Sequence, residues 1–282
     1  MKKITLFLLL LSLNMSAGNW IHDLDEARKL SLGTNKLMLV DFWASWCGPC
    51  RKMDQESWSD PEVQKLMSNY IPVQVDIDND RISATRYAVK AIPFVFIMDG
   101  NGEVVFKSMS YMPREEVLEL LKKYAVNTQF LQAEAINYYK HQNYVNSLRL
   151  AEQYIDFSLY LSPEVREDFL GVAATYLRGG EKMLKRKQKN YDLMKEKVSF
   201  LETMVELYRG NYDKVEKFLE KTDAEEISPY HEEMYGYLNL AVATRETSAE
   251  EVERWKNYLS SRRNSEAYLK RYSLFVQSSG KP

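Results

Sequence analysis

The sequence predicts an α/β domain with a mixed central sheet flanked by helices, followed by an all-α domain of helical hairpins. Up to residue 125, short apolar runs alternate with segments of helical spacing. Asp99-Gly100-Asn101-Gly102 joins two of these runs and is a strong hairpin signal. After Val126 the strand signals stop, and Leu, Tyr, Glu and Lys recur at helical spacing to the end of the chain.

The elements of the α/β domain follow one another in a regular order. Helices are expected at 24–31, 50–57, 61–68 and 113–124, and strands at 37–42, 72–76, 94–98 and 104–107. The first helix begins near Asp23, and the third begins at Pro61, whose missing N–H costs nothing in a first turn. This order predicts helices on both faces of the sheet.

The only two cysteines of the chain, Cys47 and Cys50, are separated by two residues at a strand-to-helix junction. A thiol at a helix N-terminus meets unsatisfied N–H groups and the positive end of the helix dipole, which favour the thiolate. We therefore expect Cys47 to be the attacking nucleophile. Cys50 lies one turn further on, where it can attack the Cys47 sulfur and resolve a mixed disulfide. Gly48 and Pro49 are small, and proline suits a first helical turn.

Three other interpretations of the cysteine pair are weaker. A structural disulfide closing a four-residue loop would constrain the unfolded chain little. A zinc site needs four ligands, and the remaining candidates His22, His141 and His231 are remote in sequence. Haem attachment needs a histidine directly after the second cysteine, where Arg51 stands. Redox chemistry is therefore favoured, with no metal and no cofactor besides the Cys47–Cys50 couple.

Several separated segments, in order, resemble the thioredoxin superfamily over roughly residues 19–124. The segment VDFWASWCGPC at 40–50 resembles the family's active-site strand and loop. VQVDID at 73–78 resembles its central strand, and AIPFVF at 91–96 resembles its cis-proline loop and the strand that follows. SWSDPEV at 57–63 resembles an insertion in thioredoxin-like domains of periplasmic disulfide-interchange reductases. Gln74, Phe94 and Ser110-Tyr111 depart from the common family pattern, which changes the rim around Cys47 more than its chemistry.

The resemblance implies a role for each matching residue. Cys47 is the nucleophile and Cys50 the resolving thiol, while Asp41 is the buried carboxylate that relays a proton to or from Cys50. The backbone edge of Pro93 pairs with the bound substrate strand. The surface that contacts the substrate comprises Trp46, Gly48, Pro49, Ile92 and Pro93.

Physical chemistry supports the role of Asp41 independently. A carboxylate within an apolar strand is disfavoured when charged, so its pKa should rise toward the range useful for proton transfer. The alternative is that Asp41 is a strand-end residue that faces water.

The N-terminus predicts export. Met1-Lys2-Lys3 is basic, residues 4–13 are apolar, and Ser16-Ala17-Gly18 offers small residues for cleavage, so residues 1–18 are expected to be a signal peptide. The apolar segment is short for a membrane span, although an uncleaved anchor is the alternative. Removing Lys2 and Lys3 changes the formal net charge from −2 to −4, which gives nucleic-acid binding no electrostatic support.

Residues 19–125 are thus expected to form the thioredoxin-like domain and residues 126–282 the helical one. The dipeptide Asn-Tyr occurs at 143–144 and again at 211–212, a spacing of twice the 34-residue period of tetratricopeptide-type helical hairpins. Further breaks between helices are expected near Gly179-Gly180 and Thr247-Ser248. An ordinary helical bundle is the alternative. The many tyrosines are expected mainly in helix packing, with a minority lining a peptide-binding groove. The basic cluster within 182–189 is expected to be a solvated helix face.

Together these features predict an exported, periplasmic thiol–disulfide oxidoreductase acting on protein disulfides. Gly48-Pro49 between the cysteines resembles reducing members of the superfamily, which favours a reductase. A reductase outside the cytoplasm needs electrons, so a membrane electron donor is an expected partner, and the helical domain is expected to bind a peptide or protein. The alternative is a helical binding or assembly protein in which the cysteine pair is only regulatory.

Overall fold

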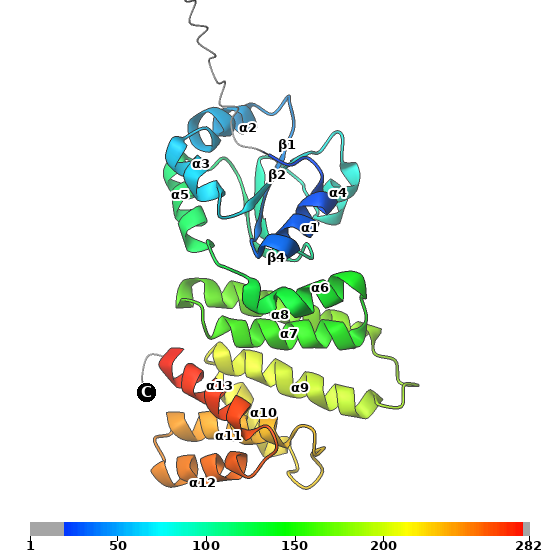
Figure 1. Ribbon diagram of the computed structural model, residues 1–282, viewed down its shortest axis with the longest axis vertical. Helices are drawn as coiled ribbons and strands as arrows, with labels where there is room; N and C mark the ends of the chain where they lie inside the picture. The colour runs from blue at the N-terminus through cyan, green and yellow to red at the C-terminus, as the bar shows by residue number, and fades with distance from the viewer. Residues whose placement is uncertain (1–19, 279–282) are drawn as a thin grey trace, which may run out of the picture.

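The computed structural model describes residues 20–278 and contains the predicted α/β and all-α parts (Figure 1). The sheet has the order β2-β1-β3-β4, with β1 parallel to β2 and antiparallel to β3, and β3 antiparallel to β4. The α/β part consists of α1 (Leu24–Thr34), β1 (Met38–Trp43), α2 (Gly48–Met53), a π-helical turn η1 (Asp54–Trp58), α3 (Pro61–Met67), β2 (Ile71–Asp76), α4 (Arg81–Arg86), β3 (Phe94–Met98), β4 (Val104–Met109) and α5 (Arg114–Lys123).

The two faces of the sheet belong to different apolar clusters. Because successive strand side chains point to opposite faces, Leu39 of β1 packs with Trp58 and Val95 on one face, while Val40 and Phe42 pack on the other. The strands β1 and β3 lie in the middle of the sheet and are buried almost throughout. This explains their nearly continuous apolar sequences.

Two local predictions for the α/β part need correction. The single helix expected at 50–57 is instead α2 followed by η1, which shifts the helical spacing at Asp54. The helix α4 was not predicted, because none of its residues is buried and it therefore has no apolar periodicity. Its start is fixed by the side chain of Asp80, which accepts the N–H of Ser83 at 2.9 Å.

The all-α part continues from α5 as a stack of helices (Figure 1). Asn143 and Asn211 occupy the N-cap positions of α7 and α10, and Ser248 caps α12, so three expected helix boundaries are confirmed. The elements are a 3₁₀ turn η2 (Gln129–Leu131), α6 (Gln132–Lys140), α7 (Tyr144–Ser158), α8 (Pro163–Met183), α9 (Tyr191–Tyr208), α10 (Tyr212–Lys221), α11 (Glu232–Arg245), α12 (Ala249–Ser260) and α13 (Ser265–Ser278).

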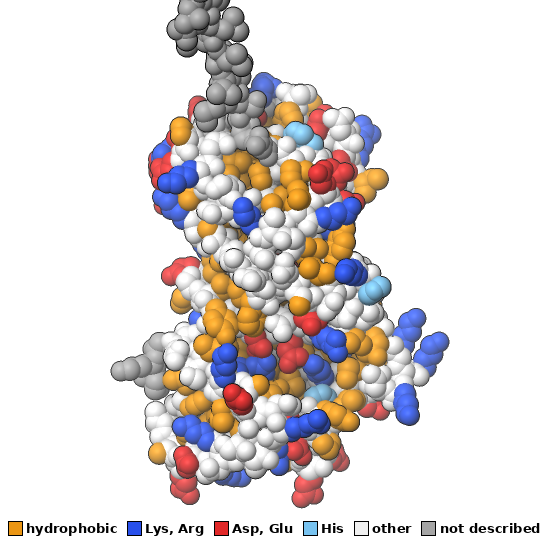
Figure 2. Space-filling model, viewed as in Figure 1, with side chains coloured by type: hydrophobic (Ala, Val, Ile, Leu, Met, Phe, Trp, Pro, Cys, Tyr) orange, Lys and Arg blue, Asp and Glu red, His pale blue; other side chains and the backbone are white. Residues whose placement is uncertain are grey.

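The break expected near Gly179-Gly180 is wrong, because α8 runs through both glycines to Met183. A Cβ atom on Gly180 would lie 2.9 Å from Cδ2 of Leu148 on α7, so this glycine permits close helix packing. The basic cluster is also placed differently. Lys185, Arg186 and Lys187 are exposed in the loop after α8, where blue side chains project in Figure 2, and not on a helix face.

The two parts share a buried junction at the hairpin between β3 and β4. Asp99 in this hairpin accepts hydrogen bonds from the hydroxyl groups of Tyr154 on α7 and Tyr176 on α8. The side-chain amide of Asn101 donates to the carbonyl oxygen of Ala135 on α6 at 3.1 Å. Helices α6 to α8 therefore lie against the hairpin end of the sheet, while α2 lies toward the other end (Figure 1).

Candidate functional site

Cys47 and Cys50 form a disulfide where β1 passes into α2. Cys47 is the N-cap residue of α2, and its Sγ atom accepts the backbone N–H of Cys50 at 3.2 Å. A negative charge on this sulfur is stabilised by that N–H group and by the helix dipole. In the reduced protein this geometry would favour the thiolate of Cys47. The roles of Cys47 as nucleophile and Cys50 as resolving thiol stay predictions.

The residues predicted to contact the substrate surround this disulfide but differ in exposure. Gly48 and Pro49 are exposed, and Trp46 has 61% of its surface accessible. The indole N–H of Trp46 donates to Oδ2 of Asp78 at 2.7 Å, which fixes the ring beside the cysteines. Ile92 is half-buried against the cysteine pair.

Pro93 follows Ile92 through a cis peptide bond, in agreement with the resemblance to the cis-proline loop. Its side chain is buried, so any contact with a substrate would use the backbone of this loop and the part-exposed Ile92. Among residues 20–278, no group of three or more His, Cys, Asp or Glu side chains is arranged to hold a metal ion.

Asp41 lies in β1 and is buried, with 2% of its surface accessible, so it does not face water. Burial raises the pKa of its carboxyl group to about 7, and the charge of Asp54 adds to this rise. The side chains of Gln74 and Trp58 oppose the rise because they favour the ionised form. A carboxyl group with this pKa can accept or donate a proton near neutral pH.

Two groups that act on Asp41 were not predicted from the sequence, the indole of Trp58 and the carboxyl group of Asp54. The indole N–H of Trp58 donates to Oδ2 of Asp41 at 3.2 Å, and the amide of Gln74 donates to Oδ1 of Asp54 at 3.2 Å. Burial also raises the pKa of Asp54. Asp54 lies four residues after Cys50, on the same helix face, and this spacing was the signal that could have identified it.

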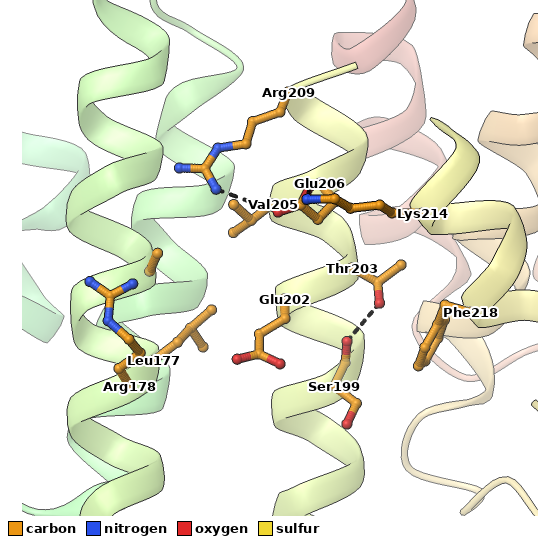
Figure 3. A pocket seen from close by; sticks show the side chains of 11 residues that line it. Leu177, Arg178, Ser199, Glu202, Thr203, Val205, Glu206, Arg209, Lys214 and Phe218 are labelled. Atoms are coloured by element: carbon orange, nitrogen blue, oxygen red, sulfur yellow. Dashed lines mark hydrogen bonds and ion pairs between the residues drawn. The ribbon is translucent and has the colours of Figure 1, made fainter. Parts of the chain in front are cut away.

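A separate cavity of about 460 Å³ lies in the all-α part, between α8, α9 and α10. Arg178 on α8 and Glu202 on α9 line it from two neighbouring helices, and Glu202 extends toward α8 (Figure 3). Glu206 in its wall forms ion pairs with Lys214 at 2.8 Å and Arg209 at 3.5 Å. The lining also includes two hydroxyl and four apolar side chains: Ser199, Thr203, Ala174, Leu177, Val205 and Phe218. The cavity is open to solvent and combines charged and apolar groups.

Comparison with known proteins places the cysteine site in a family. Residues 24–125 match the thioredoxin-like domain family. The thioredoxin of Mycoplasmoides gallisepticum is 34% identical over 91 residues, which are 32% of this chain and 87% of that protein. The thioredoxin of Bacillus subtilis is 33% identical over 95 residues, which are 31% of this chain and 82% of that protein.

Solved structures similar to the chain include a mutant thioredoxin and the C-terminal domain of another protein. The mutant thioredoxin, from Halobacterium salinarum, has 22% identity and a TM-score of 0.31, covering 38% of this chain and 89% of its own. The oxidised C-terminal domain of DsbD from Neisseria meningitidis has 20% identity and a TM-score of 0.32, covering 37% of this chain and 98% of its own.

Fold and site together define a redox protein with a dithiol/disulfide active site. The chain belongs to the thioredoxin family through residues 24–125, and its Cys47–Cys50 pair makes it a thiol–disulfide oxidoreductase. The family match ends at residue 125, before α6 begins.

Proposed function

We propose that this protein is an exported reductase of protein disulfides. The observation that carries the proposal is the Cys47–Cys50 disulfide at the start of α2, preceded in β1 by the buried Asp41, whose pKa is raised to about 7. Gly48-Pro49 between the cysteines supports the reducing direction. Reducing thioredoxins of this type have potentials near about −270 mV, whereas strong oxidants lie near about −120 mV.

The reduced protein would act in two exchange steps. The Cys47 thiolate attacks one sulfur of a substrate disulfide, forming a mixed disulfide and releasing the other substrate sulfur as a thiolate. Cys50 then loses its proton and attacks Cys47, which breaks the mixed disulfide and releases the second substrate thiolate. Water or Asp41 protonates the released thiolates. Two electrons pass to the substrate, and the protein is left with the Cys47–Cys50 disulfide.

The surface around Cys47 supports a protein substrate. Trp46, Gly48 and Pro49 are exposed next to the sulfur, and Ile92 adds a half-buried apolar side chain. Such a rim can receive an extended segment on either side of a disulfide. We propose Trp46, Gly48, Pro49, Ile92 and Pro93 as the groups that contact this segment.

We propose further that the protein works outside the cytoplasm, in the periplasm. The expected signal peptide at 1–18, which motivates this proposal, lies outside the described residues. None of the helices within 20–278 is long and apolar enough to cross a membrane. Because each turnover leaves Cys47 and Cys50 oxidised, an exported reductase needs a supply of electrons. We propose a membrane protein as this donor.

The cavity between α8, α9 and α10 favours a second function, the binding of a peptide or protein by the helical part. Its mixed charged and apolar lining, with Arg178 on α8 and Glu202 on α9, suits a polypeptide segment (Figure 3). Substitution of Cys47 by Ala separates the two functions. If the cellular function of the protein survives this substitution, the redox pair is secondary and binding is primary.

The reductase proposal is tested by trapping. Cys50→Ser should accumulate mixed disulfides between Cys47 and exported proteins, because the second exchange step is blocked. Cys47→Ser, which has the same number of cysteines, is the matched control and should trap none. Trapped partners that disappear under reducing conditions support the proposal. It fails if neither trapped partners nor turnover of a disulfide substrate is found.

A further inference from the structure

Trp58 is in direct contact with Asp41, the proposed proton relay, and the two exchange steps do not involve its indole N–H. It ends η1, is completely buried, and donates its hydrogen bond to Oδ2 of Asp41. The second oxygen, Oδ1, is also buried but has no hydrogen-bond partner among residues 20–278. The two oxygens of this carboxyl group are therefore not equivalent. Oδ2 accepts the hydrogen bond of the indole, whereas Oδ1 can accept a proton.

The side chain of Asp41 lies on the face of the sheet that α2 covers. Asp41 and Leu39 are two residues apart in β1, so their side chains share a face, and Leu39 packs with Met53 of α2. Asp54 follows Met53, and its N–H donates to the carbonyl oxygen of Cys50. Cys50 thus lies one turn from Asp54, on a helix that faces Asp41.

We propose that Trp58 is a positioning residue of the redox site: its indole N–H fixes Oδ2 of Asp41 so that Oδ1 receives the proton of Cys50. This inference rests on the proposed reductase function. In the second exchange step the Cys50 S–H bond breaks and its proton passes to Oδ1. The Cys50 thiolate then forms the bond to Cys47, and the substrate thiolate leaves with the electron pair of the broken mixed disulfide.

The groups packed around Asp41 determine how strongly the hydrogen bond of Trp58 affects the pKa of its carboxyl group. The titratable group whose charge acts on Asp41 is Asp54 from the helical side, and Cys50 lies one turn before Asp54 on the same helical segment. From β2 the neighbour is the neutral Gln74, whose amide donates to Asp54, and from β3 it is the apolar Val95. The indole of Trp58 donates directly to Asp41 and, together with the side chain of Gln74, favours the ionised form of its carboxyl group.

Trp58 is itself held in place from several sides. Trp20 packs edge-on against its ring, with centroids 5.4 Å apart, and the side-chain amide of Gln64 donates to its carbonyl oxygen. The neighbouring Ser57 donates from its hydroxyl group to the carbonyl oxygen of Met112 at 2.8 Å. These contacts restrict the indole to one orientation, which a positioning role requires.

The test measures the Cys50 step directly in the full chain. Reduced protein is mixed rapidly with Ellman's reagent, which releases one coloured thiolate when Cys47 attacks it and a second when Cys50 resolves the mixed disulfide. Cys50→Ser should retain only the first phase, which assigns the second. The rate of the second phase is then followed against pH for the wild type and for W58F.

We expect W58F to move the midpoint of this pH profile upward by about one unit, because loss of a hydrogen bond to the charged form raises the pKa of the carboxyl group. Below the midpoint the second phase should then be about tenfold slower. W20F is the matched control, because it alters packing around Trp58 but removes no hydrogen bond to Asp41. Its profile should stay at the wild-type midpoint.

Two further variants separate positioning from packing. A benzothienyl analogue of Trp58, in which sulfur replaces the indole N–H, keeps the ring shape and should shift the profile as W58F does. In a D41N background, W58F should cause no further shift, because its target no longer titrates. An unshifted profile in W58F and the analogue, or a shift that persists in D41N, would overturn the inference. If the wild type itself shows no second phase, the reductase proposal fails as well.

Discussion

The hydroxyl group of Tyr176 donates a hydrogen bond of 2.5 Å to Oδ2 of Asp99, across the boundary between the thioredoxin-like and helical parts. Tyr154 donates to the same oxygen at 2.8 Å, while Oδ1 accepts the backbone N–H groups of Asn101 and Glu103. Burial raises the pKa of Asp99, and these four donors oppose the rise. A single carboxylate therefore organises the hairpin and attaches it to α7 and α8.

Replacement of Asp99 by Ala should lower the free energy of unfolding by about 3 kcal/mol, because it leaves several buried donors without an acceptor. Asp168→Ala is the matched control. Asp168 also accepts a tyrosine hydroxyl, from Tyr124 at 2.6 Å, but its side chain is 31% exposed, so water can replace it. Urea unfolding at neutral pH measures both. Equal, small losses in the two variants would show that the junction does not depend on Asp99.

Asp41 should make the oxidised protein less stable as the pH rises. Its pKa is raised in the folded state from 3.8 to about 7, so the folded state binds the proton more tightly than the unfolded chain. The contribution of Asp41 to the free energy of unfolding is therefore fully present below about pH 4 and is lost as the pH rises through about 7. The free energy of unfolding changes by about 4 kcal/mol over this range.

Asp41→Asn removes this titration. We therefore expect the free energy of unfolding of the variant, relative to that of the wild type, to increase as the pH rises from about 4 to about 8. Little of this increase should be present at the acidic end of the range. Urea unfolding of both oxidised proteins across this range measures the difference, and other carboxyl groups cancel in it. A difference between the two proteins that does not change with pH would contradict the raised pKa.

Two adjacent glycines of α8 should respond in opposite ways to the same substitution. A Cβ atom on Gly179 would lie 3.6 Å from the Ser147 hydroxyl oxygen, an ordinary contact, so Gly179→Ala should stabilise the helix by up to about 1 kcal/mol. On Gly180 it would lie 2.9 Å from Leu148, so Gly180→Ala should destabilise by about 1–3 kcal/mol. Thermal unfolding compares the pair. The packing account of these glycines is wrong if both variants shift the midpoint in the same direction.

Arg271 connects α13 to α7 through a buried ion pair. Its Nη2 atom lies 2.7 Å from Asp156 and 3.6 Å from Glu152, and its side chain is 12% exposed. Arg271→Ala leaves Asp156 buried without this cation and should cost about 3–5 kcal/mol. Arg254→Ala breaks an exposed pair with Glu251 at 3.2 Å and should cost less than about 1 kcal/mol. Similar denaturation midpoints for these two variants would contradict the assigned importance of Arg271.

Features set by neighbouring residues could be predicted from the sequence. Cys47 and Cys50 are close because their spacing and the helix start place them together, and the hairpin at Asp99 follows from its turn residues. The burial of Asp41 followed from the apolar residues around it in β1. In each of these cases the deciding interactions lie within a few residues along the chain.

Features set by packing between distant segments could not be predicted. The contact of Trp58 with Asp41 depends on the π-helical turn η1, and Gly180 is a packing site only because α7 crosses α8 there. The bonds of Asp99 to Tyr154 and Tyr176 join residues more than fifty positions apart. A glycine pair or a hairpin aspartate has the same local sequence whether or not a helix packs against it.

The most direct test of the reductase account is the reduction potential of the Cys47–Cys50 pair. The protein would be equilibrated with defined ratios of oxidised and reduced glutathione or dithiothreitol, and its dithiol fraction measured. For a reductase we expect a reversible two-electron transition near about −250 mV or lower. A potential near about −150 mV or higher would indicate an oxidase or isomerase, and the lack of any reversible transition would contradict the redox function itself.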